Sequence, residues 1–120
     1  MALIKQYTRA DQGLPPVVPI FGLIGPIYRA TLHHTAGPTA FSKERCIELK
    51  KQYDAQHRAQ GWGGIGYHLT MDSYGRLYHL RPRDLKGAHT GGQNTGNFGI
   101  TVHGNFDKDE LNLLQRRTLK

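Results

Sequence analysis

The sequence contains a single cysteine, Cys46, so an intrachain disulfide is impossible and a disulfide-stabilised fold is excluded. Long apolar runs are also missing, and no stretch is long and apolar enough to span a bilayer. The apolar segment 19–27 is interrupted by Pro and Gly, and the N-terminus lacks the charged-then-apolar layout of a secretory signal. We therefore expect a globular chain that is made in the cytoplasm and has no membrane span.

Acidic residues are scarce. Nine Asp and Glu against 16 Lys and Arg give a net charge of +7, so the surface attracts polyanions. Nucleic acid and an anionic cell-wall polymer are both candidate partners. The basic residues are scattered, and no helix-turn-helix, RNP-type or zinc-finger pattern accompanies them, which makes nucleic acid the weaker alternative.

The adjacent histidines His33 and His34 are the most distinctive local feature. They follow apolar and β-branched residues in the segment 28–36, which we expect to form a short, largely buried strand. Successive side chains of a strand point to opposite faces, so the two imidazoles cannot face the same pocket. One is a candidate metal ligand or base, and the other a packing residue.

The remaining pattern predicts two helices and three more strands. A helix is expected from an N-cap at Ser42 to Gln60, with Cys46 on its buried face and Lys43, Lys50, Lys51, Asp54 and Arg58 on its solvated face. Strands are expected at 65–71, 76–80 and 98–104, the first two joined by a hairpin turn. Asp107 and Glu110 predict the start of a last helix with an apolar side of leucines.

These elements predict an α/β domain of 120 residues with a single mixed β-sheet and helices packed on it. Residues 1–27 form an N-terminal segment that we expect to be anchored by Val17, Val18, Ile20 and Phe21, and residues 28–120 form the domain proper. The glycine-rich polar loop 87–97 has the length of a binding loop.

Five blocks together carry a family resemblance. In order they are Leu32-His33-His34-Thr35-Ala36, the Gly-Trp-Gly-Gly-Ile-Gly-Tyr-His-Leu block at 61–69, the segment 72–82, Gly87-Ala88-His89-Thr90, and the segment 99–106. This arrangement resembles the type 2 N-acetylmuramoyl-L-alanine amidase family, which includes phage endolysins and the peptidoglycan recognition proteins.

The resemblance implies a zinc hydrolase that cleaves the amide between N-acetylmuramic acid and L-alanine in bacterial peptidoglycan, acting on the wall after release from the cell. It implies that His33 is a zinc ligand and that Tyr67 assists catalysis. His34, His89, Thr90 and Asn97 are the substrate-binding candidates, with a packing role as the alternative for His34. We expect His57 at a rim, Trp62 in packing, and His68, His79 and His103 in structural roles.

One part of the family pattern has no counterpart. The family's other two zinc ligands, a His and a later Cys or Asp, follow the last helix, and this sequence has no such positions. We therefore expect residues 28–120 to be the N-terminal part of an amidase domain, incomplete at the C-terminus, with weak zinc binding and little hydrolysis. A non-catalytic peptidoglycan-binding module is the alternative.

Overall fold

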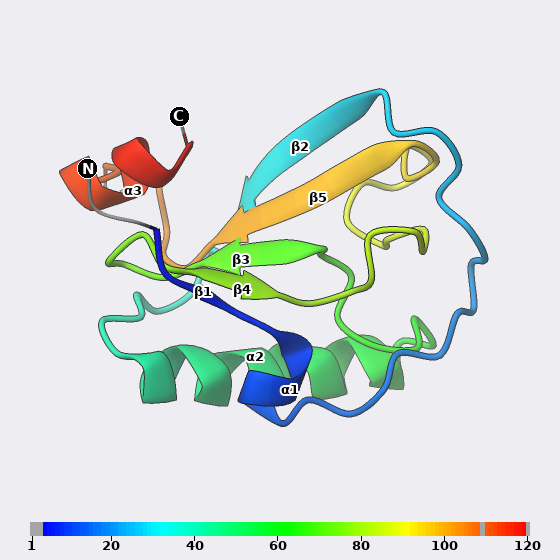
Figure 1. The fold of residues 1–120 in the computed structure, drawn as a ribbon, viewed down its shortest axis with the longest axis horizontal. Helices are drawn as coiled ribbons and strands as arrows, with labels where there is room; N and C mark the ends of the chain where they lie inside the picture. The colour runs from blue at the N-terminus through cyan, green and yellow to red at the C-terminus, as the bar shows by residue number, and fades with distance from the viewer. Residues whose placement is uncertain (1–3, 109, 120) are drawn as a thin grey trace.

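The computed structural model describes residues 4–108 and 110–119 and contains one five-stranded sheet (Figure 1). The elements are β1 (Gln6–Tyr7), α1 (Arg9–Gln12), β2 (Arg29–His34), α2 (Lys43–Ala59), β3 (Leu69–Met71), β4 (Leu77–His79), β5 (Asn97–Val102) and α3 (Leu113–Leu119). The strand order is β1-β4-β3-β5-β2, with β3 and β4 antiparallel and the other pairs parallel. The predicted α/β architecture, a single mixed sheet with helices packed on it, is confirmed.

Strand β2 lies at the edge of the sheet and is more exposed than expected. All six of its residues pair in parallel with β5, and His33 lies opposite Thr101 in the register. Leu32 is nevertheless 49% exposed, and no residue of the strand is fully buried. The prediction of a largely buried strand was wrong because an edge strand has one neighbour instead of two.

Helix α2 begins and ends where the sequence predicts. The Ser42 hydroxyl accepts a hydrogen bond from the backbone N–H of Arg45, and Gly61 after the helix has a φ of +85°. Its apolar face carries Cys46, whose burial raises its thiol pKa to about 12. In Figure 1 the helix runs below the sheet on the side of β1 and β4.

The opposite face of α2 is only partly solvated, which corrects the prediction. Lys50 is 1% exposed, donates to the side-chain oxygen of Gln12, and places Nζ 3.5 Å from the centre of the Tyr78 ring. Asp54 is also buried. The reason is that the N-terminal segment packs over this face, which the local helix pattern does not indicate.

That N-terminal segment is anchored differently from the prediction. Strand β1 pairs with β4, which buries Tyr7, and Ile24 is buried further along the chain. Val18, Ile20 and Phe21, expected to anchor the segment, are instead exposed.

The β3–β4 hairpin forms around Asp72. This buried carboxylate accepts hydrogen bonds from the Tyr78 hydroxyl, from Nε of Arg76 and from two backbone N–H groups of the turn. Strand β3 starts at Leu69, later than the predicted residue 65, because the backbone N–H groups of residues 65 and 66 donate to side chains of α2.

Helix α3 starts later than predicted. The capping pair is Asn112 and Gln115: each side chain accepts a hydrogen bond from the other's backbone N–H. The predicted cap at Asp107 was therefore wrong, and Leu113 is 83% exposed rather than on a buried side. In the described ranges, no helix is long and apolar enough to cross a membrane.

Candidate functional site

Two histidines from distant parts of the chain meet beside β2. Nε2 of His33 lies 3.0 Å from Nδ1 of His89, which belongs to the loop between β4 and β5. The Thr90 hydroxyl oxygen lies 3.3 Å from the same His33 nitrogen and 3.1 Å from the same His89 nitrogen. Three polar atoms therefore form a closely spaced triangle, which we call the His33–His89–Thr90 triangle.

The His89 imidazole is fixed in both position and tautomer. Its Nε2 lies 2.9 Å from the backbone carbonyl oxygen of Asn97. Because a carbonyl only accepts, Nε2 carries the proton and Nδ1 keeps its lone pair toward His33. An added Cβ would come within 2.5 Å of the ring at Gly99 and within 2.8 Å at Gly87, so two glycines leave the space that the ring fills.

Both imidazoles of the triangle favour the neutral form. Desolvation lowers the pKa of His33, and the nearby His34 lowers it further. Desolvation is also the main cause that lowers the pKa of His89, partly opposed by the Asn97 carbonyl. Neutral imidazoles offer lone pairs that can accept a hydrogen bond or ligate a cation.

Tyr67 is the third aromatic side chain at this place. Its ring centre lies 5.5 Å from that of His33 and 6.4 Å from that of His89. Burial raises the pKa of Tyr67, so its hydroxyl is protonated at neutral pH and can donate a hydrogen bond.

A cavity of about 340 Å³ opens beside these side chains, and we call it the Tyr67 groove. Its lining residues are Phe21, His57, Trp62, Tyr67, Ala88, His89, Thr90, Gly91 and Asn94. The volume is near the lower end of the range for small-molecule sites, and polar groups lie among aromatic ones, as such sites require.

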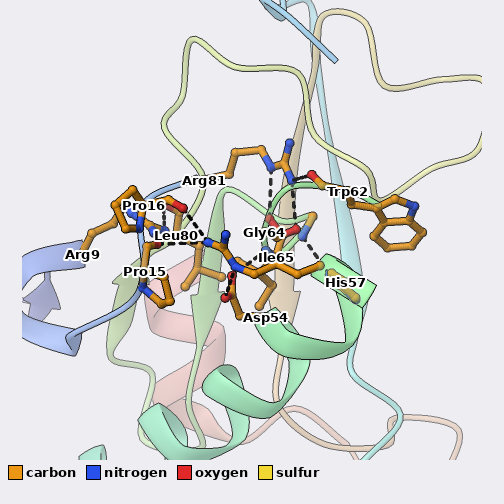
Figure 2. Close-up of polar contacts among 12 residues, drawn as sticks. Arg9, Pro15, Pro16, Asp54, His57, Trp62, Gly64, Ile65, Leu80 and Arg81 are labelled. Carbon is orange, nitrogen blue, oxygen red and sulfur yellow. Dashed lines mark hydrogen bonds and ion pairs between the residues drawn. The ribbon is translucent and has the colours of Figure 1, made fainter. Parts of the chain in front are cut away.

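A buried arginine fixes one wall of the groove (Figure 2). Arg81 is 2% exposed and donates hydrogen bonds to the carbonyl oxygens of Trp62, Gly64, Ile65 and Lys86, at 2.7 to 3.0 Å. Desolvation lowers its pKa. One guanidinium therefore ties the turn that carries Trp62 to the loop that leads to His89.

Helix α2 holds the same turn from the other side. The Asp54 carboxylate accepts hydrogen bonds from the backbone N–H of Ile65 at 2.8 Å and from Nε of Arg58 at 2.7 Å. Nδ1 of His57 accepts from the backbone N–H of Gly66 at 2.9 Å, and the His57 ring contacts Trp62. These contacts hold the backbone that leads into Tyr67.

The structure brings together four of the six predicted site residues and leaves two apart. His33, Tyr67, His89 and Thr90 form one cluster. His34 points to the other face of the sheet, where its Nδ1 accepts from the backbone N–H of Phe106. His34 and His33 both line a second cavity, of about 390 Å³, which also includes Phe106.

Asn97, the other predicted substrate-binding residue, is turned inward. Its buried amide accepts a hydrogen bond from the Thr31 hydroxyl and donates one to the Gln93 carbonyl. Its role in this structure is to shape the loop and to present its own carbonyl to His89. His34 and Asn97 are thus both placed away from the Tyr67 groove.

Sequence reasoning did not identify Asn94 as part of the site. Its side-chain oxygen accepts hydrogen bonds from the backbone N–H groups of His89 and Thr90, at 3.1 and 2.9 Å. Asn in a glycine-rich loop is a common source of such local backbone contacts, and this was the available signal. His57, expected at a rim, and Trp62, expected in packing, both line the groove.

The other three histidines lie outside the Tyr67 groove: His68 and His103 are buried, and His79 is exposed. His68 accepts from the backbone N–H of Gly99 through Nδ1 and contacts the Leu85 carbonyl through Nε2. His103 is fully buried, and desolvation lowers its pKa to about 4. His79 is exposed and contacts Gln6.

The atoms around His33 include nitrogens of the type that bind zinc, but there are few of them. Two neutral imidazole nitrogens are ligand atoms of the kind that zinc takes, whereas a threonine hydroxyl is not one of its usual ligands. Among the residues that the structure describes, no group of three or more His, Cys, Asp or Glu side chains could hold a metal ion.

Three comparisons relate this geometry to known proteins. A family model described as N-acetylmuramoyl-L-alanine amidase matches residues 25–120. Peptidoglycan-recognition protein SC2 of Drosophila simulans is 34% identical over 87 residues, which are 72% of this chain and 47% of that protein. The N-acetylmuramoyl-L-alanine amidase of Homo sapiens is 31% identical over 117 residues, covering 85% of this chain and 20% of that protein.

Solved structures of known proteins also share this fold. The ectodomain complex of peptidoglycan recognition proteins LCa and LCx bound to tracheal cytotoxin contains a chain with a TM-score of 0.88 and 30% identity. That match covers 97% of this chain and 71% of the solved one. The chain thus spans about half or less of the length of the curated relatives named above.

Proposed function

Since the chain belongs to the N-acetylmuramoyl-L-alanine amidase family, which includes peptidoglycan recognition proteins, we propose that its Tyr67 groove binds the muramyl-peptide part of bacterial peptidoglycan. We propose further that the amidase domain to which residues 28–120 belong is a zinc-dependent hydrolase of the amide between N-acetylmuramic acid and L-alanine. The observation that carries the proposal is that Tyr67 and His89 line one groove while the His33 imidazole lies against both of their rings.

The proposed reaction adds water across one amide bond. The products are the lactyl carboxylate of the sugar and the free amine of L-alanine. A zinc ion near His33 would supply polarisation of the amide carbonyl and a more acidic water. Tyr67, whose raised pKa keeps its hydroxyl protonated, would donate a hydrogen bond to the carbonyl oxygen as negative charge develops there.

A non-catalytic peptidoglycan-binding module is the second candidate. It is favoured by the small number of metal-ligating side chains in the described part of the chain. The names of the two curated relatives cover both activities, one a recognition protein and the other an amidase. In either case the partner is the bacterial wall, which the protein would reach after release from the cell that makes it.

Binding and hydrolysis can be measured on the same sample. Trp62 is the single tryptophan and lines the groove, so its fluorescence reports ligand entry when purified muropeptide is added. Mass spectrometry of the same mixture, with zinc or with a chelator, detects stem peptide released from the sugar. Release that depends on zinc and on His33 supports the hydrolase, and binding without release supports the module. An unchanged fluorescence would contradict both.

A further inference from the structure

We propose that Phe21 is a specificity-determining residue that packs against the pyranose ring of an N-acetylated sugar in the Tyr67 groove. Phe21 belongs to residues 15–24, which we call the N-terminal strap and which precede the segment matched by the family model. This inference rests on the proposed function, because it takes a muramyl peptide as the occupant of the groove. It deepens that function by naming the part of the ligand that is recognised and a residue that recognises it.

Backbone hydrogen bonds on both sides of Phe21 hold the N-terminal strap against the groove. Before Phe21, the backbone N–H of Val18 donates to the Gly63 carbonyl at 2.9 Å, which ties the strap to the turn that carries Trp62. After Phe21, the backbone N–H of Lys86 donates to the Gly22 carbonyl at 2.9 Å. The position of the Phe21 backbone is therefore fixed relative to two separate parts of the groove wall.

The N-terminal strap also packs closely on the turn and on helix α2. A Cβ added at Gly63 would come within 2.2 Å of the Val18 carbonyl oxygen and within 2.9 Å of the Ile20 side chain. Nη2 of Arg58 on α2 donates to the Pro16 carbonyl at 2.6 Å. The strap is thus a built part of the wall, and Phe21 is presented to the groove by a fixed backbone.

The lining of the Tyr67 groove favours an uncharged part of the ligand. Among the described residues that line it, none is Lys, Arg, Asp or Glu, although the whole chain carries a net charge of +7. The stem peptide of peptidoglycan carries carboxylates, and carboxylates are recognised best by Arg and Lys side chains. An N-acetylated sugar in amide linkage to its peptide carries no charge, so it matches this lining better than the peptide does.

The aromatic side chains of the groove suit a sugar ring. A pyranose has faces of C–H groups and a rim of hydroxyl and acetamido groups, so it needs both apolar surface and hydrogen-bonding partners. Phe21 and Trp62 supply aromatic surface, and Thr90 and Asn94 supply polar groups. Phe21 is 38% exposed, whereas Val18, Ile20 and Leu23 are exposed without lining the groove. Phe21 is therefore the residue of the strap that a ligand in the groove can cover.

Calorimetric titration with two ligands, in the presence of a chelator to prevent hydrolysis, tests the inference. One ligand is a muropeptide with N-acetylmuramic acid, and the other is the matching N-lactoyl stem peptide without the sugar ring. We expect the wild type to prefer the muropeptide, and Phe21→Ala to lower the ratio of the two affinities by about tenfold. Phe21→Tyr keeps the aromatic face and should keep the ratio. Leu23→Ala, the matched control, removes an exposed apolar side chain from the same strap and should also keep it.

The ratio separates the inference from the proposed function. If the wild type binds the muropeptide and Phe21→Ala has the same ratio, the role of Phe21 is refuted and the proposed function stands. A wild type without a preference for the muropeptide, or a variant that weakens both ligands equally, refutes the assignment of Phe21 to the sugar. A wild type that binds neither ligand refutes the proposed function and the inference with it.

A measurement on the wild type alone covers the case in which a variant folds poorly. Intermolecular nuclear Overhauser effects in the muropeptide complex should connect the ring protons of Phe21 to the pyranose protons of the sugar. Effects from Phe21 to the protons of the stem peptide, with none to the sugar, would overturn the inference.

Discussion

The imidazole of His89 lies directly over the α-carbon of Gly99, so a methyl group at residue 99 would come within 2.5 Å of the ring. Gly99→Ala therefore forces His89 out of its position, while the backbone conformation itself does not require glycine. We expect Nδ1 of His89 to lose its 3.0 Å contact with Nε2 of His33, and muropeptide binding, followed by Trp62 fluorescence, to weaken. Overpacking should cost about 1–3 kcal/mol of folding free energy, measured by urea denaturation.

Gly91→Ala is the matched control for that change. Gly91 belongs to the same loop and lines the same groove, but a Cβ there meets no atom within 4 Å. We expect muropeptide binding and stability close to those of the wild type. Equal effects of the two substitutions would show that loop stiffness, rather than the position of the His89 ring, is responsible.

Replacing Arg81 should loosen the wall of the groove. Arg81→Met removes hydrogen bonds to four carbonyl groups, three in the 62–66 turn and one at Lys86. We expect a loss of about 3 kcal/mol or more in the free energy of unfolding, because buried acceptors are left unpaired. The fluorescence of Trp62 should shift toward that of a solvated indole. Arg83→Met, at an exposed position nearby, should change neither quantity.

Arg81→Lys distinguishes charge from geometry at the same position. A lysine keeps the positive charge, but its single ammonium group cannot reach four carbonyls as a planar guanidinium does. We expect it to restore only a part of the lost stability. Full restoration would mean that the charge alone holds the turn.

Lys50 should make stability depend on pH. Burial lowers its pKa to about 7 from 10.5, so above pH 7 the unfolded chain holds a proton that the folded chain releases. The free energy of unfolding should therefore rise with pH above 7, by up to about 1.4 kcal/mol per pH unit. Cys46, with its pKa raised to about 12 from 9.0, acts in the opposite direction near and above pH 9.

Urea denaturation between pH 7 and pH 8.5 isolates the effect of Lys50. Lys50→Met should flatten the rise, and Lys51→Met, at an exposed position one residue on, should keep it. The same slope in all three proteins would contradict the lowered pKa.

The elements that sequence reasoning predicted correctly have local causes. The N-cap at Ser42 and the hairpin turn with Gly75 depend on residues within a few positions of one another. The resemblance blocks indicated His33, Tyr67 and His89 as site residues, although the direct contact between His33 and His89 spans 56 positions and became visible only in the structure.

The elements that sequence reasoning missed depend on distant partners. Lys50 looked like a solvated residue because its helix pattern does not include Gln12, which lies 38 positions earlier and accepts its hydrogen bond. Strand β1 has two residues and forms only because Tyr7 pairs with Tyr78. Such contacts carry no local periodicity and cannot be predicted from one sequence.

Tyr67→Phe tests the proposed role of the phenol in hydrolysis. The substitution removes only the hydroxyl, so the ring should keep its contacts with His33 and His57 and the fold should be preserved. If Tyr67 donates a hydrogen bond to the developing oxyanion, the rate of stem-peptide release in a zinc-supplied assay should fall by about 10²–10³. Muropeptide binding, followed by Trp62 fluorescence, should change by less than about tenfold, because the bond strengthens only as charge develops. A matching loss of binding and rate would instead place the hydroxyl in ground-state recognition.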